Sequence, residues 1–193
     1  MPDPTPSMIE IPTLETSRLR LRPHRREDFP ACLALWADPT VTRYIGGRPF
    51  SREEVWARFL RYAGGWHWLG FGYWAVEEIS TGQFIGELGY SQNERSFDPP
   101  LTLLDAAGLS MPELGWVLSP QVHGRGYATE AVRAALGWGD SHVAASCAFC
   151  IIHPDHRASI RVAQKCGFLE ASRPSYQTEP TILFTRNKAD RHR

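Results

Sequence analysis

A strand–turn–helix pattern over residues 113–130 constrains the fold of this chain more than any other feature. A β-prone run ends at Pro120, a turn with Gly124 and Gly126 follows, and an amphipathic helix begins at once. The first N–H groups of a helix have no internal partner and carry the positive end of its dipole. The turn therefore suits an anion such as a pyrophosphate, although an ordinary strand-to-helix connection has the same spacing.

The rest of the chain mixes amphipathic helices with strands that read as hairpins. Leu19 and Leu21 alternate with the outward-pointing Arg20 and Arg22, and a capping box opens a helix at Ser51. This order predicts an α+β fold with a mixed, mainly antiparallel sheet flanked by helices. We expect strands at 16–22, 71–78, 84–90, 113–118, 144–152 and 181–185, helices at 28–37, from 51 onward, at 126–139 and at 155–166, and an inserted loop at 93–110.

Composition excludes several classes of partner. Lysine and arginine together number 21, as do aspartate and glutamate, so the formal net charge is zero. A chain without a basic field has no electrostatic means to hold nucleic acid or an anionic membrane. The sequence contains no apolar run near the roughly 18 residues of a membrane span, and its start does not read as a signal peptide. Four scattered cysteines suit a reducing, cytoplasmic environment.

The chain reads as one domain with two short appendages. Its 193 residues, 42% of them hydrophobic, are enough for one sizeable core. We expect residues 1–12, which are rich in proline, to be a flexible N-terminal segment. Residues 13–187 form the single predicted domain, and residues 188–193 form a basic tail.

Three segments resemble the GCN5-related N-acetyltransferase (GNAT) superfamily. The run Gln121-Val122-His123-Gly124-Arg125-Gly126 resembles the Gln/Arg-x-x-Gly-x-Gly/Ala signature of that family. The block from His153 to Phe168 is similar to a second family segment, which has Pro-x-Asn-x-x-Ser and then Lys-x-Gly-Phe. The opening from Leu14 to Pro23 is similar to the first strand of the RimJ/RimL-like branch, which acetylates the N-termini of ribosomal proteins. The resemblance covers residues 12–187.

The resemblance implies an acyl-CoA N-acyltransferase fold, whose central strands splay apart. Acetyl-CoA is implied as the co-substrate, without a metal, in the gap between residues 113–118 and 144–152. The pantetheine then bonds the first strand, and the turn after it holds the pyrophosphate. The implied coenzyme-binding residues are Trp116, Val117, Leu118, Gln121, Val122, His123, Gly124, Arg125, Gly126, Tyr127, Ala128, Thr129, His156 and Ser159.

The same resemblance implies direct attack of an amine on the thioester, which needs a base and an acid. Glu113 is the candidate base, and Glu87 on the neighbouring strand is its rival. Ser159 is the candidate acid, with water as the alternative, because Ala163 occupies the position where many relatives have a tyrosine. His156 replaces the asparagine of the family, and its imidazole is larger and titratable.

The sequence is compatible with more than one acceptor for the acetyl group. This acceptor is a primary amine, either a protein N-terminus or a small molecule such as a polyamine or an antibiotic. Trp36, Tyr44 and Trp66 are candidates for the acceptor pocket. The alternative function is a CoA-binding regulator without catalysis, and dimerisation is expected only because of the family resemblance.

A zinc site is the competing interpretation of the segment around residue 150. Cys147, Cys150, His153 and His156 are spaced as in some zinc sites. The two cysteines lie three residues apart on a predicted strand, so their side chains leave opposite faces. One ion does not easily bind both, and we therefore expect buried thiols rather than a metal site.

Overall fold

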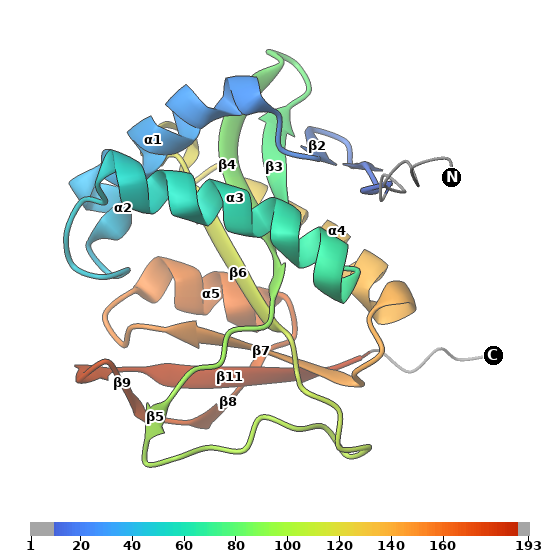
Figure 1. Ribbon diagram of the computed structural model, residues 1–193, viewed down its shortest axis with the longest axis vertical. Helices are drawn as coiled ribbons and strands as arrows, with labels where there is room; N and C mark the ends of the chain where they lie inside the picture. The colour runs from blue at the N-terminus through green and yellow to red at the C-terminus, as the bar shows by residue number, and fades with distance from the viewer. Residues whose placement is uncertain (1–9, 189–193) are drawn as a thin grey trace, which may run out of the picture.

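The structure, a computed structural model, describes residues 10–188. Most of the N-terminal segment predicted to be flexible (residues 1–9) and most of the predicted basic tail (residues 189–193) lie outside the described residues. Its main sheet has eight strands in the order β1-β2-β3-β4-β6-β7-β11-β8 (Figure 1). Its strands are β1 (Leu14–Glu15), β2 (Leu19–Arg22), β3 (Tyr73–Glu78), β4 (Gln83–Ser91), β6 (Glu113–Leu118), β7 (Cys147–Ile152), β11 (Ile182–Asn187) and β8 (Leu169–Ser172). All neighbours run antiparallel except β6 and β7, which confirms the predicted α+β class with a mixed, mainly antiparallel sheet.

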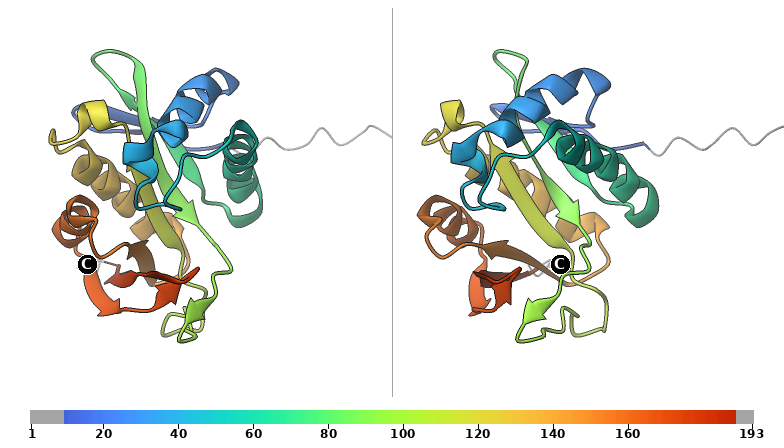
Figure 2. Two further views of the ribbon diagram at one scale, coloured as in Figure 1. Left: turned by 90° about the vertical axis from the view of Figure 1, so that its left-hand side faces the viewer. Right: turned by 60° about the vertical axis from the view of Figure 1, so that its left-hand side comes forward.

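Helices cover both faces of this sheet. Figure 2 shows α1 and α3 on one face, with α4 and α5 on the other. The helices are α1 (Phe29–Ala37), α2 (Pro39–Thr42), α3 (Arg52–Leu69), α4 (Tyr127–His142) and α5 (Arg157–Lys165), with 3-10 turns η1 (Arg26–Asp28) and η2 (Pro120–Val122). Within the described residues, no helix is both long and apolar enough to cross a membrane.

The predicted helix boundaries follow local signals that the structure confirms. Ser51 caps α3: its Oγ accepts from the N–H of Glu54 at 3.3 Å, and its own N–H donates to the Glu54 carboxylate at 2.7 Å. Gly167, with φ of 83°, ends the turn after α5 as a left-handed cap. The loop predicted at 93–110 contains β5 (Phe97–Asp98), which pairs with β9 (Ser175–Tyr176) in a small sheet completed by β10 (Glu179–Pro180).

One sequence-based expectation about β2 is wrong. Leu19 and Leu21 are fully buried as predicted, but Arg22 is also buried instead of facing solvent. Its guanidinium donates to both oxygens of Asp28, at 2.7 and 2.8 Å, and to Glu77 at 2.7 Å. The outer face of β2 is therefore a buried ion-pair layer, because the turn η1 folds over it and supplies the carboxylate of Asp28.

The sheet splits between its two central strands. β4 and β6 pair along six residues, whereas β6 and β7 pair at a single position, Glu113 with Phe149. Beyond that pair the two strands diverge, as Figure 1 shows. The splayed arrangement expected for the acyl-CoA N-acyltransferase fold is thus present, and it leaves one edge of β6 without a partner strand.

Candidate active site

The unpaired edge of β6 presents backbone groups to the split. The N–H of Ser119 donates to the carbonyl of Ile85 at 2.8 Å, so residues 119, 117 and 115 direct their backbone groups toward β4. The alternate residues, Trp116 and Leu118, direct theirs toward β7, which has moved away. The Leu118 carbonyl lies 3.0 Å from Nε2 of His123. The backbone of Trp116 is therefore the main hydrogen-bonding group that faces the gap.

The turn after β6 carries a run of free amides. Gly124 and Gly126 have φ values of 77° and 80°, a left-handed conformation that glycine adopts without strain. The N–H groups of Val122 and His123 are already bonded within η2, and the first bond of α4 runs from Glu130 to Gly126. Among the described residues, the N–H groups of residues 124–129 have no acceptor. These six adjacent donors at a helix N-terminus can bind a diphosphate.

A network of side chains holds this turn in place. The Glu130 carboxylate accepts from Thr16 Oγ1 at 2.7 Å and from Nε of Arg18 at 2.7 Å. The same arginine donates to the carbonyl of Arg125 at 2.9 Å. The hydroxyl of Tyr127 donates to Glu78 at 2.5 Å. The conformation of the turn is therefore fixed by the start of β2 and the end of β3, which are far from it in sequence.

The candidate base Glu113 lies at the closed end of the split and is 6% exposed. Two guanidinium nitrogens of Arg95 donate to its carboxylate, at 2.5 and 2.7 Å. The amide of Asn93 adds a third bond at 3.0 Å. This bidentate pair fixes the orientation of the carboxylate. Arg95 reaches it from the loop that precedes β6.

The rival base Glu87 is completely buried under α1 and α3. Its carboxylate accepts from Trp36 Nε1 at 2.8 Å and from the hydroxyl of Tyr62, and Cys32 Sγ lies 3.6 Å away. His24 Nε2 lies 3.4 Å from the same group. Burial alone would raise the pKa of Glu87, but the adjacent imidazole of His24 and the hydrogen bonds from Tyr62 and Trp36 outweigh it and lower the pKa. Glu87 is thus an internal anchor rather than an accessible proton acceptor.

Tyr73 is a site residue that sequence reasoning missed. Its ring stacks on Tyr62, with centroids 4.6 Å apart, and its hydroxyl lies over Gly115 on β6. Burial, followed by the nearby charges of Glu113 and Glu87, raises the pKa of this hydroxyl, apart from small opposing contributions of arginines. Tyr73 therefore presents a neutral O–H donor beside the split. The only available sequence signal was alternation along β3, which places residue 73 on the face of Glu77.

Ser159 belongs to a group of aromatic and imidazole side chains at the start of α5. Its Oγ lies 3.1 Å from Nε2 of His156, which stacks on Tyr44 with centroids 4.7 Å apart. Tyr44 also contacts His153, at 5.3 Å between centroids. Burial, followed by the charges of His123 and His153, lowers the pKa of His156. His156 and Ser159 thus lie together, near His123 of the turn after β6, and their role in coenzyme binding stays a prediction.

Two of the tryptophans proposed for the acceptor pocket are core residues instead. Trp36 is 2% exposed and Trp66 is 3% exposed, and each directs its indole N–H to an internal acceptor.

Cys150 packs in the large core cluster, whereas Cys147 contacts a different cluster on the other face of β7. The predicted opposition of these two thiols is therefore confirmed.

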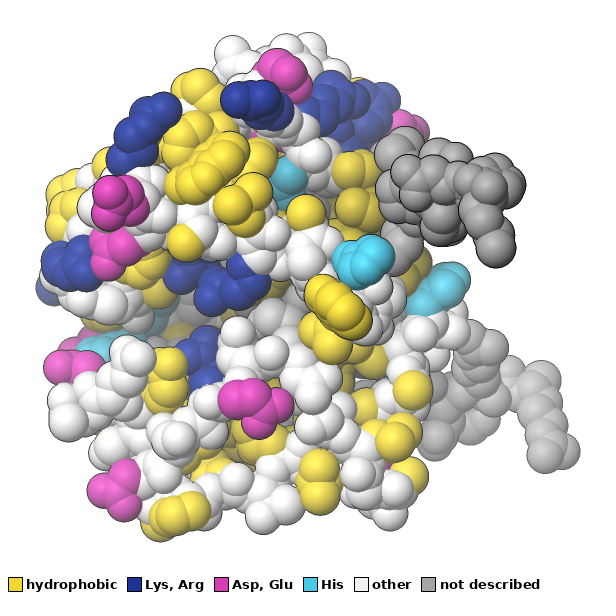
Figure 3. Space-filling view, in the orientation of Figure 1, with side chains coloured by type: hydrophobic (Ala, Val, Ile, Leu, Met, Phe, Trp, Pro, Cys, Tyr) yellow, Lys and Arg dark blue, Asp and Glu magenta, His cyan; other side chains and the backbone are white. Residues whose placement is uncertain are grey.

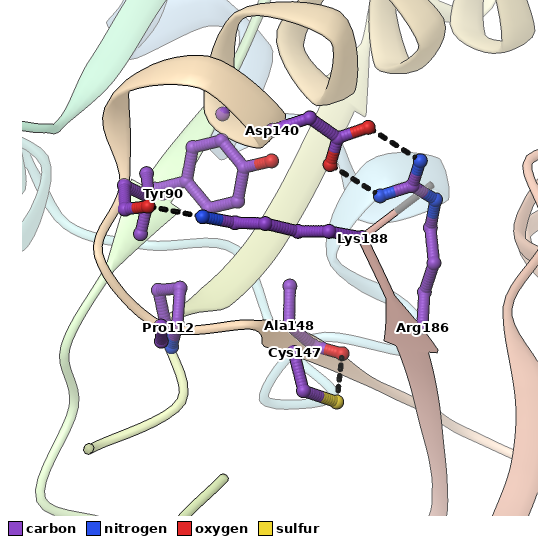
Figure 4. Close-up of a pocket in the computed structure, with 10 residues that line it drawn as sticks. Tyr90, Pro112, Asp140, Cys147, Ala148, Arg186 and Lys188 are labelled. Carbon is purple, nitrogen blue, oxygen red and sulfur yellow. Dashed lines mark hydrogen bonds and ion pairs between the residues drawn. The ribbon is translucent and has the colours of Figure 1, made fainter. Parts of the chain in front are cut away.

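An ion pair joins β11 to α4 near the closed end of the split. Figure 4 shows Arg186 and Asp140 joined by two hydrogen bonds, at 2.7 and 2.8 Å, with Lys188 and Tyr90 beside them. Lys188 donates to the carbonyl of Val143. Arg186 and Asp140 neutralise each other, whereas Lys188 bonds only a backbone carbonyl. These side chains line a small pocket between the end of α4 and β11.

A family model and a curated relative each match most of this chain. A family model described as an acetyltransferase (GNAT) domain matches residues 18–169. The uncharacterized N-acetyltransferase YoaA of Bacillus subtilis (strain 168) is 27% identical over 162 residues, which cover 82% of this chain and 83% of the relative. The residues matched by the family model include the split, the turn at residues 122–129 and the start of α5.

Solved structures share the fold over almost the whole chain. The acetyltransferase from Agrobacterium tumefaciens str. C58 superposes with a TM-score of 0.76 at 30% identity, covering 92% of this chain and 95% of that one. Spermidine N-acetyltransferase from Vibrio cholerae, solved with CoA and spermine, gives a TM-score of 0.68 at 15% identity, covering 90% and 97%. The second likeness is one of fold alone.

Proposed function

Because this chain belongs to the GNAT acetyltransferase family, we propose that it moves the acetyl group of acetyl-CoA to a primary amine. One observation carries this proposal: six adjacent backbone N–H groups are free at the point where β6 and β7 have parted. A diphosphate fits the N–H groups, and an arm with amide groups fits the open edge of β6. Coenzyme A carries both features in one molecule.

The geometry narrows the proposed coenzyme contacts. Trp116 and Leu118 present backbone groups toward the gap, whereas those of Val117 bond β4, so Val117 contributes its side chain only. Residues 124–129 donate to the diphosphate, while Val122 and His123 shape the turn. His156 and Ser159 line the same region from α5. Gln121, whose side chain bonds Ser119, positions the start of the turn.

The acceptor amine approaches from the face of α1 and α3, opposite the helix that holds the diphosphate. Its nitrogen lone pair attacks the thioester carbon, the C–S bond breaks, one N–H proton leaves, and the sulfur takes up a proton. Glu113, Gly115 and Val117 lie on this face of β6. We assign proton removal, through a water molecule, to Glu113 rather than Glu87, because Glu113 lies on β6 at the closed end of the split, whereas Glu87 is enclosed beneath Trp36 of α1 and Tyr62 of α3.

Tyr73 is better placed than Ser159 to protonate the leaving sulfur. Its hydroxyl lies over Gly115 and has no hydrogen-bond partner among the described residues, whereas Ser159 Oγ is already next to His156. Burial raises the pKa of Tyr73 and so keeps its hydroxyl protonated, which leaves a donor available to the developing thiolate. Ser159 then acts by holding the imidazole of His156.

A thiol-release assay with a panel of amines tests this function, with calorimetric titration of CoA in parallel. We expect micromolar CoA binding and amine-dependent thiol release that falls about 100-fold in Glu113→Gln. Tight CoA binding without release for any amine would instead support the alternative, a CoA-binding regulator. Absence of binding at millimolar CoA would overturn both.

A further inference from the structure

An unpaired guanidinium lies beside the buried anchor Glu87. Arg58 of α3 places its guanidinium carbon 4.0 Å from the ring centre of Trp36 and 5.2 Å from that of Phe50. Its Nε is buried and has no hydrogen-bond partner in the described part of the chain. Arg58 thus packs on a stacked aromatic pair with one donor unsatisfied, and an anion could supply the missing acceptor.

A second unpaired guanidinium follows one turn later on the same helix. Arg61 is three residues from Arg58 and is exposed, so the two lie on neighbouring positions of one helix face. Tyr62, four residues after Arg58 on the same helix, stacks on Tyr73, so this face of α3 is directed toward the split. Within residues 10–188 neither arginine forms an ion pair.

The carboxylates of this region are already occupied. Glu113 is paired with Arg95, and Glu87 is enclosed by Trp36 and Tyr62. Figure 3 shows basic side chains gathered along the lower edge of α3, where the surface is hollowed toward α5 and β7. On the acceptor side of the split, the two carboxylates nearest Tyr73 thus have partners, whereas Arg58 and Arg61 have no ion pair among the described residues.

We propose that the acceptor amine carries a carboxylate near its amino group, and that Arg58 and Arg61 bind this carboxylate while the amine lies beside Gly115. This inference rests on the proposed acetyl transfer. The planar fork of a guanidinium matches the two oxygens of a carboxylate. A polyamine or an aminoglycoside would bring positive charge to the same surface and would be repelled.

The proposal is tested with pairs of acceptors that differ only in one carboxylate. The pairs also distinguish a free amino acid from an acidic peptide as the acceptor. One pair is serine and serinamide, and the other is the tripeptide Ser-Glu-Ala-amide and its Ser-Gln-Ala-amide counterpart; spermidine is the cationic acceptor. We expect kcat/KM to be at least tenfold higher for the acid in one pair. Preference within the first pair identifies a free amino acid, and preference within the second identifies an acidic peptide.

The variant Arg61→Glu should remove that preference, because it replaces an attractive charge by a repulsive one. KM for the acidic acceptor should rise about tenfold or more while kcat stays within twofold, since Arg61 does not contact the reacting atoms. Arg52→Glu is the matched control: it reverses another exposed charge on α3, over Phe29, and should retain the preference.

Three results would contradict the proposal in different ways. Equal rates within both pairs, or spermidine as the best acceptor, would overturn the carboxylate assignment and leave the acetyl transfer standing. A preference that survives in Arg61→Glu would show that these arginines do not bind the carboxylate. CoA binding without thiol release for every acceptor would overturn the proposed function itself.

Discussion

The hydroxyl of Tyr73 lies so close to Gly115 that a Cβ on that glycine would come within 2.2 Å of the oxygen. β3 and β6 are not neighbours in the sheet, because β4 lies between them. The tyrosine side chain therefore crosses over β4 to reach β6. A glycine is required at position 115 because any side chain there would overlap Tyr73, and not because the backbone has an unusual φ angle.

The first prediction follows directly. Gly115→Ala should destabilise the fold by about 1–3 kcal/mol, because the new methyl group overlaps the phenol oxygen. Adding Tyr73→Phe should restore most of the loss, since the nearest remaining ring atom, Cζ, lies at 3.4 Å. Urea denaturation of the two single variants and the double variant measures this coupling. Additive losses would show that the two residues do not meet.

A second prediction concerns the proton for the leaving sulfur. Tyr73→Phe should lower kcat roughly 100-fold without changing the Kd for CoA, because it removes only a proton donor. Ser159→Ala should lower kcat less than threefold. Steady-state kinetics with parallel calorimetry separates the two. The reverse order of effects would assign the proton transfer to Ser159.

The third prediction tests the anion-binding turn. Gly124→Ala and Gly108→Ala impose the same backbone strain, about 1–2 kcal/mol, because both glycines have positive φ and open space around them. Only residue 124 lies in the proposed diphosphate site. CoA affinity should therefore fall at least tenfold in Gly124→Ala and stay unchanged in Gly108→Ala. Equal affinities in calorimetry would place the diphosphate elsewhere.

A fourth prediction separates the two carboxylates. Glu87→Gln should lower Tm, since it leaves Tyr62 and Trp36 with a weaker acceptor, while kcat of the folded protein stays within tenfold. Glu113→Gln should lower kcat much more. Thermal melts recorded on the samples used for kinetics distinguish loss of folding from loss of catalysis. A larger kcat loss in Glu87→Gln would make Glu87 the base.

The fifth prediction is a pH dependence of stability. The fold lowers the pKa of His156, through burial and then the charges of His123 and His153, so the unfolded chain binds more protons below about pH 6.5. This histidine should therefore cost nothing at pH 8 and destabilise the fold increasingly as the pH falls from 6.5 to 5. His156→Asn should be less sensitive to acid than the parent. Denaturation at pH 8 and pH 5, with the exposed His67→Asn as control, checks the sign.

Local signals account for the parts of the fold and site that could be predicted. The glycines of the turn, the capping box at Ser51 and the alternation in β6 act over a few residues, so they can be read from the sequence. The backbone contacts expected of Trp116 and Leu118 are consistent with the observed register, although their role in coenzyme binding stays a prediction.

Long-range contacts account for what could not be predicted. Arg95 meets Glu113 across 18 residues, and Tyr62 meets Glu87 across 25. No local pattern marks either pair. Arg22 was expected outside for the same reason: charged residues are usually exposed, and only the folded turn η1 supplies the partner that permits burial.

Two ion pairs hold helix α4 near its two ends, and they affect how the proposed coenzyme would enter. Glu130 bonds Arg18 at the start of β2, and Asp140 bonds Arg186 on β11. These arginines lie on opposite halves of the large sheet, so one rigid helix sets the separation between the halves. The gap beside β6 is thus preorganised, and a ligand that enters it has no sheet contacts to break.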